Sequence, residues 1–122
     1  MSEYIVLLPD NEESWAMADE SRKQAVYAQH AAFAQALAER GHKMTGGAEL
    51  ARASQGHVVR STGTASEVTI TQGPYAETVE QLSGFYLVET DNLDDLLQVC
   101  GMLAGETGLE VRPCIDHSGD MA

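Results

Sequence analysis

Three observations predict that the 122-residue chain adopts an α+β fold. Strand and helix patterns follow one another in the order β-α-β-β-β-α-β. Each of the two helical segments carries a single apolar stripe, as expected of a helix that covers one face of a sheet. The length suits one domain, and residues 1–122 contain no repeat or low-complexity linker. Two right-handed crossovers with both helices on one face of an antiparallel sheet define a ferredoxin-like sandwich, which is the class that we expect.

The first strand and the first helix have clear sequence signals. Residues 3–9 form a short apolar run that ends in a proline and predicts a buried strand. Helical spacing then extends from residue 21 to residue 40. The stripe of this helix consists of Val26, His30, Phe33 and Leu37. Asp19 or Ser21 can cap its start, and Gly41 can adopt the left-handed conformation that ends it.

The rest of the chain predicts short strands and one more helix. The strand patterns are bounded by glycine, proline or polar residues and cover 42–50, 56–63, 66–73, 83–91 and 108–115. The second and third of these patterns give a hairpin signal around Gly-Thr-Ala. A second amphipathic helix is predicted over 92–105, with Asp91 or Asn92 as its cap. Residues 116–122 form a polar tail that we expect to fray.

An acidic connection, residues 10–21, joins the first strand to the first helix and contains Trp15. We interpret this connection as a loop. Two interpretations of Trp15 stay open: its ring is buried and anchors the loop, or it forms a lid over a pocket.

Charge excludes several function classes. Seven Lys and Arg residues against nineteen Asp and Glu residues give a net charge of −12. A nucleic-acid binder needs a basic face, which seven scattered residues cannot build, and anionic membranes are disfavoured for the same reason. The charge favours a neutral or cationic small molecule. There is no apolar run of 18 residues, and the N-terminus lacks the pattern of a signal peptide, so we expect a cytoplasmic protein.

Cysteine chemistry and cofactor motifs are weakly represented. Cys100 and Cys114 fall in different predicted elements, and we expect two buried thiols rather than a disulfide. Cys114, Asp116 and His117 lie close in sequence, but no second ligand group stands near them, so no metal site is expected. The chain contains neither a phosphate-binding loop nor a Gly-x-Ser-x-Gly elbow, and no cofactor is expected.

The expected fold leaves one face of the sheet without helices. Alternating Val, Ile, Phe and Tyr residues on that face would form an exposed apolar patch. A second copy of the chain, packed sheet on sheet around a twofold axis, would cover it. We therefore expect a homodimer.

One stretch, "QGPYAETVEQLSGFYLVETDNLDD" at residues 72–95, resembles the signature of the DGPF-type branch of the YCII-related family. Further similar segments follow the family's order: "EYIVLLPDNEESW", "QHAAFAQAL", "GGAEL" and "LEVRPC". The resemblance implies a dimeric α/β barrel of ferredoxin-like protomers. The chain departs from the motif at Gln72, where the family has Asp, and at Tyr75, where it has Phe.

The Gly73-Pro74 pair within this stretch ends one strand, because proline lacks an N–H group and fixes its own φ angle. Glu77 to Leu82 are then expected to form a compact lobe before the next strand. The corner is either purely structural, or the lobe forms one wall of a pocket.

His30 is the candidate for chemistry, because an imidazole within an apolar stripe needs a hydrogen-bond partner. It is either a core histidine or a general acid/base in a cleft between helix and sheet. The resemblance implies a helix histidine paired with an aspartate. That acid cannot be placed on this sequence, although Asp10 and Glu49 could approach the helix.

Two functions stay open. The first is a cofactor-independent enzyme that transfers protons on a small molecule, as an isomerase or lyase does. Its pocket would hold His30 with Gln72, Tyr75 and Tyr86, and Trp15 as a further substrate contact. The second is a non-catalytic ligand-binding or accessory module associated with transcription regulation, without direct contact to DNA.

Overall fold

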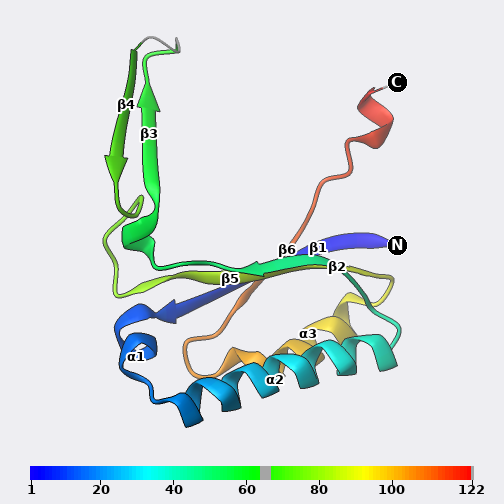
Figure 1. Ribbon diagram of the computed structural model, residues 1–122. Coiled ribbons are helices and arrows are strands. Elements are labelled where there is room, and N and C mark those ends of the chain that lie inside the picture. The colour runs from blue at the N-terminus through cyan, green and yellow to red at the C-terminus, as the bar shows by residue number, and fades with distance from the viewer. Residues whose placement is uncertain (64–66, 122) are drawn as a thin grey trace.

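The computed structural model describes residues 1–63 and 67–121. Four strands, β1 (Ser2–Asn11), β2 (Lys43–Glu49), β5 (Glu80–Thr90) and β6 (Glu110–Pro113), form one antiparallel sheet in the order β2-β5-β1-β6. Two helices, α2 (Glu20–Glu39) and α3 (Leu93–Ala104), lie on the same side of this sheet (Figure 1). The predicted α+β fold of the ferredoxin-like class is therefore confirmed.

Both long helices begin at side-chain caps. The carboxylate of Asp19 accepts a hydrogen bond from the backbone N–H of Arg22 at 2.8 Å, so Asp19 rather than Ser21 caps α2. Asn92 does the same for α3 by accepting from the N–H of Asp95 at 3.1 Å. After α2 the chain turns at Gly41, whose φ of 84° suits glycine.

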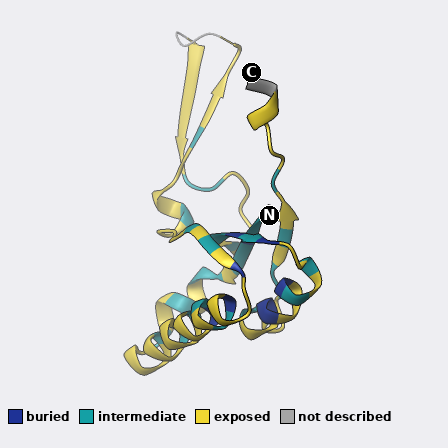
Figure 2. Cartoon of the chain, turned by 90° about the vertical axis from the view of Figure 1, so that its right-hand side faces the viewer, coloured by how far each residue is buried: buried dark blue, intermediate teal, exposed yellow. Residues whose placement is uncertain are grey.

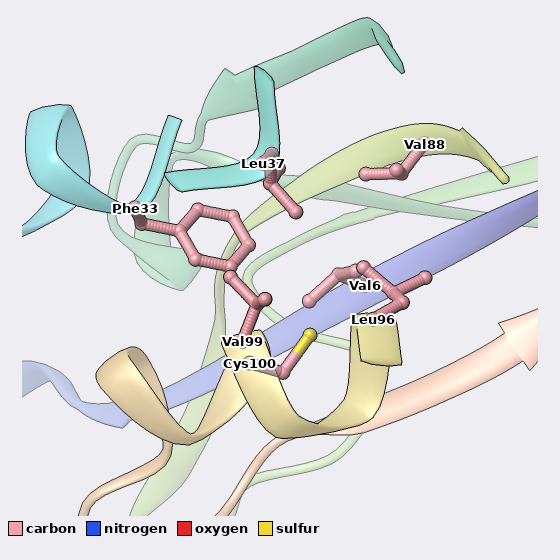
Figure 3. Close-up of a cluster of buried hydrophobic side chains, with 7 residues drawn as sticks. All are labelled: Val6, Phe33, Leu37, Val88, Leu96, Val99 and Cys100. Atoms are coloured by element: carbon pink, nitrogen blue, oxygen red, sulfur yellow. The ribbon is translucent and has the colours of Figure 1, made fainter. Parts of the chain in front are cut away.

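The hydrophobic core lies between the sheet and the two helices (Figure 3). The central strands contribute Val6 and Val88, and the helices cover these side chains. The buried helix residues are Phe33, Leu37, Leu96, Val99 and Cys100. Outside this core most residues are exposed or half-buried, as Figure 2 shows. Two residues of the predicted stripe of α2, Phe33 and Leu37, are thus core residues, whereas His30 is only half-buried.

Cys100 and Cys114 are both free cysteines. The prediction of two buried thiols is correct for Cys100 and wrong for Cys114, which is only half-buried. Burial raises the pKa of the Cys100 thiol to about 11, so this group stays protonated and behaves as a core residue.

The acidic connection is not the loop that we expected, because it contains the six-residue helix α1 (Glu12–Met17). Asn11 caps this helix through its side chain, which accepts from the N–H of Ser14 at 3.1 Å. The signal was present in the sequence: a cap residue is followed by two acids, Glu12 and Glu13, in the first turn.

The first strand continues past Pro9, where the sequence analysis ended it. The neighbouring strand β6 pairs only with Tyr4 to Leu7, so no partner on that side needs the N–H group that Pro9 lacks. On its other side β1 pairs with β5 as far as Asn11, after a register shift between Leu8 and Pro9. As a result β5 starts at Glu80, and the expected lobe of residues 77–82 is half strand.

The strands β3 (His57–Ser61) and β4 (Val68–Gln72) form the predicted hairpin. They do not join the main sheet but make a separate two-stranded sheet. Figures 1 and 2 show it projecting from the body on the side away from the helices. Residues 64–66, in the connection between these strands, lie outside the described residues.

The chain after β6 also leaves the body on the side away from the helices (Figure 1). Its last described element is a short 3-10 turn at Ser118–Met121. Residue 122 of the expected tail lies outside the described residues.

Candidate functional site

A pocket of about 620 Å³ opens between α1, α2 and the adjacent ends of three strands. Strand ends contribute backbone and side chains on one wall, and the two helices form the other. The lining includes Leu8 from β1, Trp15 from α1, Tyr27 and His30 from α2, Glu49 from β2, and Tyr86 from β5. Most of these groups are apolar or aromatic, as is usual for a small-molecule site.

His30 and Tyr86 form the polar centre of this pocket. The Nδ1 atom of His30 lies 2.7 Å from the hydroxyl of Tyr86. Tyr86 also packs on Phe33 with ring centroids 5.4 Å apart, which fixes the tyrosine ring against the core. His30 therefore lines a cavity, as the acid/base interpretation expects. It is joined to the core through Tyr86, which packs on Phe33.

The second ring nitrogen of His30 reaches solvent. Its Nε2 atom has no hydrogen-bond partner among the described residues. In this part of the chain, no side-chain nitrogen or oxygen of a non-exposed residue is both fully buried and without a partner. Nε2 must therefore be accessible, and it is free to accept or donate a proton.

The surroundings keep both partners neutral. Burial lowers the pKa of His30, and the negative charge of Glu49 opposes this effect. Burial, followed by the charge of Glu49, raises the pKa of Tyr86. Near neutral pH the pair therefore consists of an uncharged imidazole, which can take a proton, and a protonated phenol, which can donate a hydrogen bond.

Glu49 is the acid that acts on this centre. Its carboxylate accepts a hydrogen bond from the Tyr27 hydroxyl at 3.0 Å, which raises the pKa of Tyr27. Asp10 lines the same pocket, but its carboxylate accepts a hydrogen bond from the N–H of Asn11. Of the two acids considered from the sequence, Glu49 is the one whose charge influences His30.

The Gly-Gly bend in β2 makes room for Tyr86. Gly47 has a φ of 153°, and a Cβ atom there would lie 2.8 Å from Cδ1 of Tyr86 and 2.7 Å from the carbonyl oxygen of Phe85. Both distances are shorter than real carbon contacts allow. Glycine at this position therefore sets how closely β2 approaches the ring that holds His30.

We predict that Gly47→Ala breaks the contact between His30 and Tyr86. The backbone strain alone should cost about 1–3 kcal/mol, and the ring of Tyr86 must also shift. Thermal unfolding and the NMR titration of the His30 ring would record both effects. Gly101→Ala is the matched control, because a Cβ atom there meets nothing within 4 Å. Equal behaviour of the two variants would contradict the role given to Gly47.

The structure brings together three of the five residues singled out from the sequence. His30, Tyr86 and Trp15 line one pocket. Gln72 and Tyr75 do not line it. The amide of Gln72 donates to the carbonyl of Ser54 at 3.2 Å, and Tyr75 is 85% exposed at the base of the hairpin.

The Gly73-Pro74 corner closes the base of the hairpin. Gly73 has a φ of 114° and its N–H donates to the carbonyl oxygen of Gly56 at 2.8 Å. Within the described residues this corner lies outside the pocket lining, as the structural interpretation expects.

Trp15 is half-buried and lines the pocket. Its ring meets Tyr27 edge-on at 5.7 Å, and the ammonium of Lys23 lies 5.5 Å from its centroid. Sequence reasoning missed Tyr27, although it precedes His30 by three residues and so shares its helix face.

The described part of the chain contains no group of three or more His, Cys, Asp or Glu residues placed to hold a metal ion. None of its helices combines the length and the apolar character needed to cross a membrane.

Fold and site together define a small ferredoxin-like protein with a His–Tyr pair in an apolar pocket. The YCII-related domain family matches residues 2–103, and the chain belongs to this family. An uncharacterised protein of Rhizobium meliloti (strain 1021) is 45% identical over 53 residues. That alignment spans 40% of this chain and 43% of the relative.

Proposed function

We propose that this protein is a cofactor-independent enzyme that transfers protons on a small molecule, as an isomerase or lyase does. The observation that carries the proposal is the His30–Tyr86 contact of 2.7 Å in the wall of a 620 Å³ pocket. A general base has to reach its substrate and stay unprotonated near neutral pH. Accessibility of Nε2 and the lowered pKa of His30 support both requirements.

The proposed step uses two protein groups. With its proton on Nδ1, His30 donates to the Tyr86 oxygen, and its Nε2 lone pair takes a proton from a carbon next to a substrate carbonyl. The C–H bonding pair becomes a carbon–carbon double bond, and the carbonyl π pair moves onto oxygen. The Tyr86 hydroxyl donates a hydrogen bond to this oxyanion. Return of the proton to another carbon completes an isomerisation; loss of a leaving group completes an elimination.

The pocket lining indicates the size and polarity of the substrate. Aromatic and aliphatic side chains suit a small ring compound with one carbonyl or phenolic group. Such a compound is neutral or weakly acidic, which agrees with a strongly acidic protein better than a multiply charged anion does.

Trp15 is the only tryptophan, so its fluorescence tests the proposal directly. Titration with a panel of phenols and lactones should quench it in a saturable manner. A bound lactone should then exchange the hydrogen next to its carbonyl for deuterium in D₂O, followed by proton NMR. Saturable binding without exchange across the panel would overturn the catalytic proposal.

We also propose that the protein is a homodimer of the DGPF-type branch. The motif around Gly73-Pro74 and the strand β5 support the branch. The sheet face opposite the helices supports the dimer, because alternation along β1 and β5 places four apolar side chains there. These are Ile5, Leu7, Phe85 and Leu87, none of which is buried in the protomer.

One observation favours the second function, a non-catalytic ligand-binding or accessory module associated with transcription regulation. The motif position that carries Asp in the family is occupied by Gln72, and no carboxylate contacts the His30 ring among the described residues. On this alternative the same pocket would bind a ligand without turning it over.

Either function is expected to exclude direct DNA contact. Nineteen acidic residues against seven basic ones repel a polyanion. A titration of fluorescent duplex DNA at low salt should show no binding at micromolar protein. Submicromolar affinity that weakens with added salt would contradict this prediction.

A further inference from the structure

The β3–β4 hairpin carries an apolar face that the protomer leaves uncovered. Cross-strand partners share a face, and Val59 pairs with Ile70 while Ser61 pairs with Val68. Val59, Ile70 and Val68 are 61%, 64% and 40% exposed. We call these three side chains the hairpin face. The opposite face carries the pairs Val58–Thr71 and Arg60–Thr69, and Val58, its apolar residue, is half-buried.

An isolated two-stranded hairpin is at best marginally stable in water. Here hydrogen bonds at its base connect the hairpin to the segment that precedes it. The N–H of Gly73 donates to Gly56, and the side chain of Gln72 donates to Ser54. The strands themselves project clear of the body in Figures 1 and 2. Burial of the hairpin face against another surface would supply the missing stabilisation.

The accessible surface indicates how large that burial is. A folded monomer of 13.1 kDa exposes about 6,400 Å². This chain exposes 8572 Å², which is roughly 2,200 Å² more than the scaling predicts. A partner in a standard interface loses about 800 Å², and partners in obligate dimers lose about 1,000–2,500 Å² each. The excess is large enough to supply one partner's share of a standard dimer interface.

Geometry and charge favour a second copy of the chain as the occupant. The hairpin rises on the side of the main sheet that lacks helices, where the dimer is proposed to form (Figure 1). The C-terminal segment rises on that side too and carries Ile115, which is 78% exposed. The hairpin positions that share this face, His57, Val59, Ser61, Val68, Ile70 and Gln72, include no carboxylate, so two acidic chains can meet there without strong repulsion.

We propose that the β3–β4 hairpin is an intermolecular arm whose face docks on a second copy of this chain. In a twofold dimer each copy offers one arm and receives one, so the two arms clasp the pair. This inference rests on the proposed homodimer. It assigns most of the association energy to the arm rather than to the sheet face alone.

Two charge-matched double variants test the arm. Val59→Asp with Ile70→Asp places two carboxylates on the hairpin face. Thr69→Asp with Thr71→Asp places two carboxylates on the opposite face of the same hairpin. All four residues are exposed in the protomer, so neither variant disturbs the core. Sedimentation velocity at protein concentrations from about 0.1 to about 100 μM measures the dimer dissociation constant of each variant.

We expect the wild type to be a dimer, with at least a 100-fold increase in dissociation constant for the first variant and less than a 5-fold increase for the second. Circular dichroism checks that both double variants fold. If the first does not, the single variant Ile70→Ser replaces it in the measurement of the dissociation constant. A wild-type dimer that both variants leave intact, or weaken equally, overturns the arm but not the dimer. A monomeric wild type at about 100 μM overturns both and leaves the proton-transfer proposal untouched.

Discussion

Replacing His30 by alanine should lower the rate of proton exchange on a bound lactone by about 10²–10⁴-fold, the usual contribution of a general base. The overall fold should persist, because the ring is only half-buried and the neighbouring core residues Phe33 and Leu37 remain. Loss of its hydrogen bond to Tyr86 should cost about 1 kcal/mol of unfolding free energy. Deuterium exchange by NMR and thermal unfolding measure the two quantities separately.

His30→Gln separates proton transfer from hydrogen bonding. Glutamine can donate and accept hydrogen bonds but cannot take a proton near neutral pH. We expect it to retain ligand-dependent quenching of Trp15 and to lose exchange. Gln35→Ala is the control, since Gln35 is exposed on α2 and does not line the pocket. A His30→Ala protein that exchanges as fast as the wild type would remove His30 from the mechanism.

The pH dependence of exchange has a defined sign. Burial lowers the pKa of His30, so the base becomes active at a pH below the value of about 6.5 that a free histidine has. The rate should rise with pH to a plateau, and the midpoint of the rise should lie below that value. The same shift means that the unfolded chain binds more protons in this window, so the contribution of His30 to stability also rises with pH there.

Replacing His42 by alanine should cost about 2–3 kcal/mol of unfolding free energy, or roughly 8–12 °C in melting temperature for a chain of this length. His42 is 5% exposed. Its Nδ1 lies 2.7 Å from the Thr90 hydroxyl, and its Nε2 lies 2.7 Å from a carboxylate oxygen of Asp95. Removing the ring leaves a cavity and deprives the buried Thr90 hydroxyl of one of its partners, while the N–H of Asn92 still donates to it at 2.9 Å.

The contrast with Gln35→Ala, which should melt within about 2 °C of the wild type because its side chain is exposed on α2, checks this result. Arg40 and then His42 hold the pKa of Asp95 below its usual range. The contribution of the network is therefore fully present above the usual aspartate pKa and is lost as the pH falls through the lowered value. A His42→Ala protein as stable as Gln35→Ala would show that the buried network contributes nothing.

How far the sequence could be interpreted depended on whether the signal was local. Apolar spacing placed α2 and α3 to within a few residues, because a stripe such as Phe33 and Leu37 is fixed by helix geometry alone. Pairing was harder. β1 continues past Pro9 because the distant strand β6 stops pairing at Leu7. The residues near Pro9 carry no signal for where β6 ends.

The site shows the same division. His30 stood out because a histidine interrupts an apolar stripe, and Tyr86 lies on a predicted strand. Their contact joins positions 56 residues apart and depends on the register of β5. Gln72 and Tyr75 were grouped with them through motif position, yet the hairpin carries that motif away from the pocket. His42 lies just after a predicted helix, and its hydrogen bonds join it to Thr90 and Asp95, which are about 50 residues away in the sequence.

One short segment connects two regions that otherwise share little. The carboxylate of Glu12, at the start of the helix that holds Trp15, accepts a hydrogen bond from the N–H of Ala53 at 2.7 Å. Leu50 and Arg52 in this segment line the pocket, and Gly56 at its end anchors the hairpin base. Residues 50–56 thus belong both to the pocket wall and to the attachment of the hairpin. Ligand binding in the pocket and docking of the arm on a second copy would both affect this segment. By thermodynamic linkage, the factor by which a bound molecule changes dimer affinity must equal the factor by which dimerisation changes affinity for that molecule.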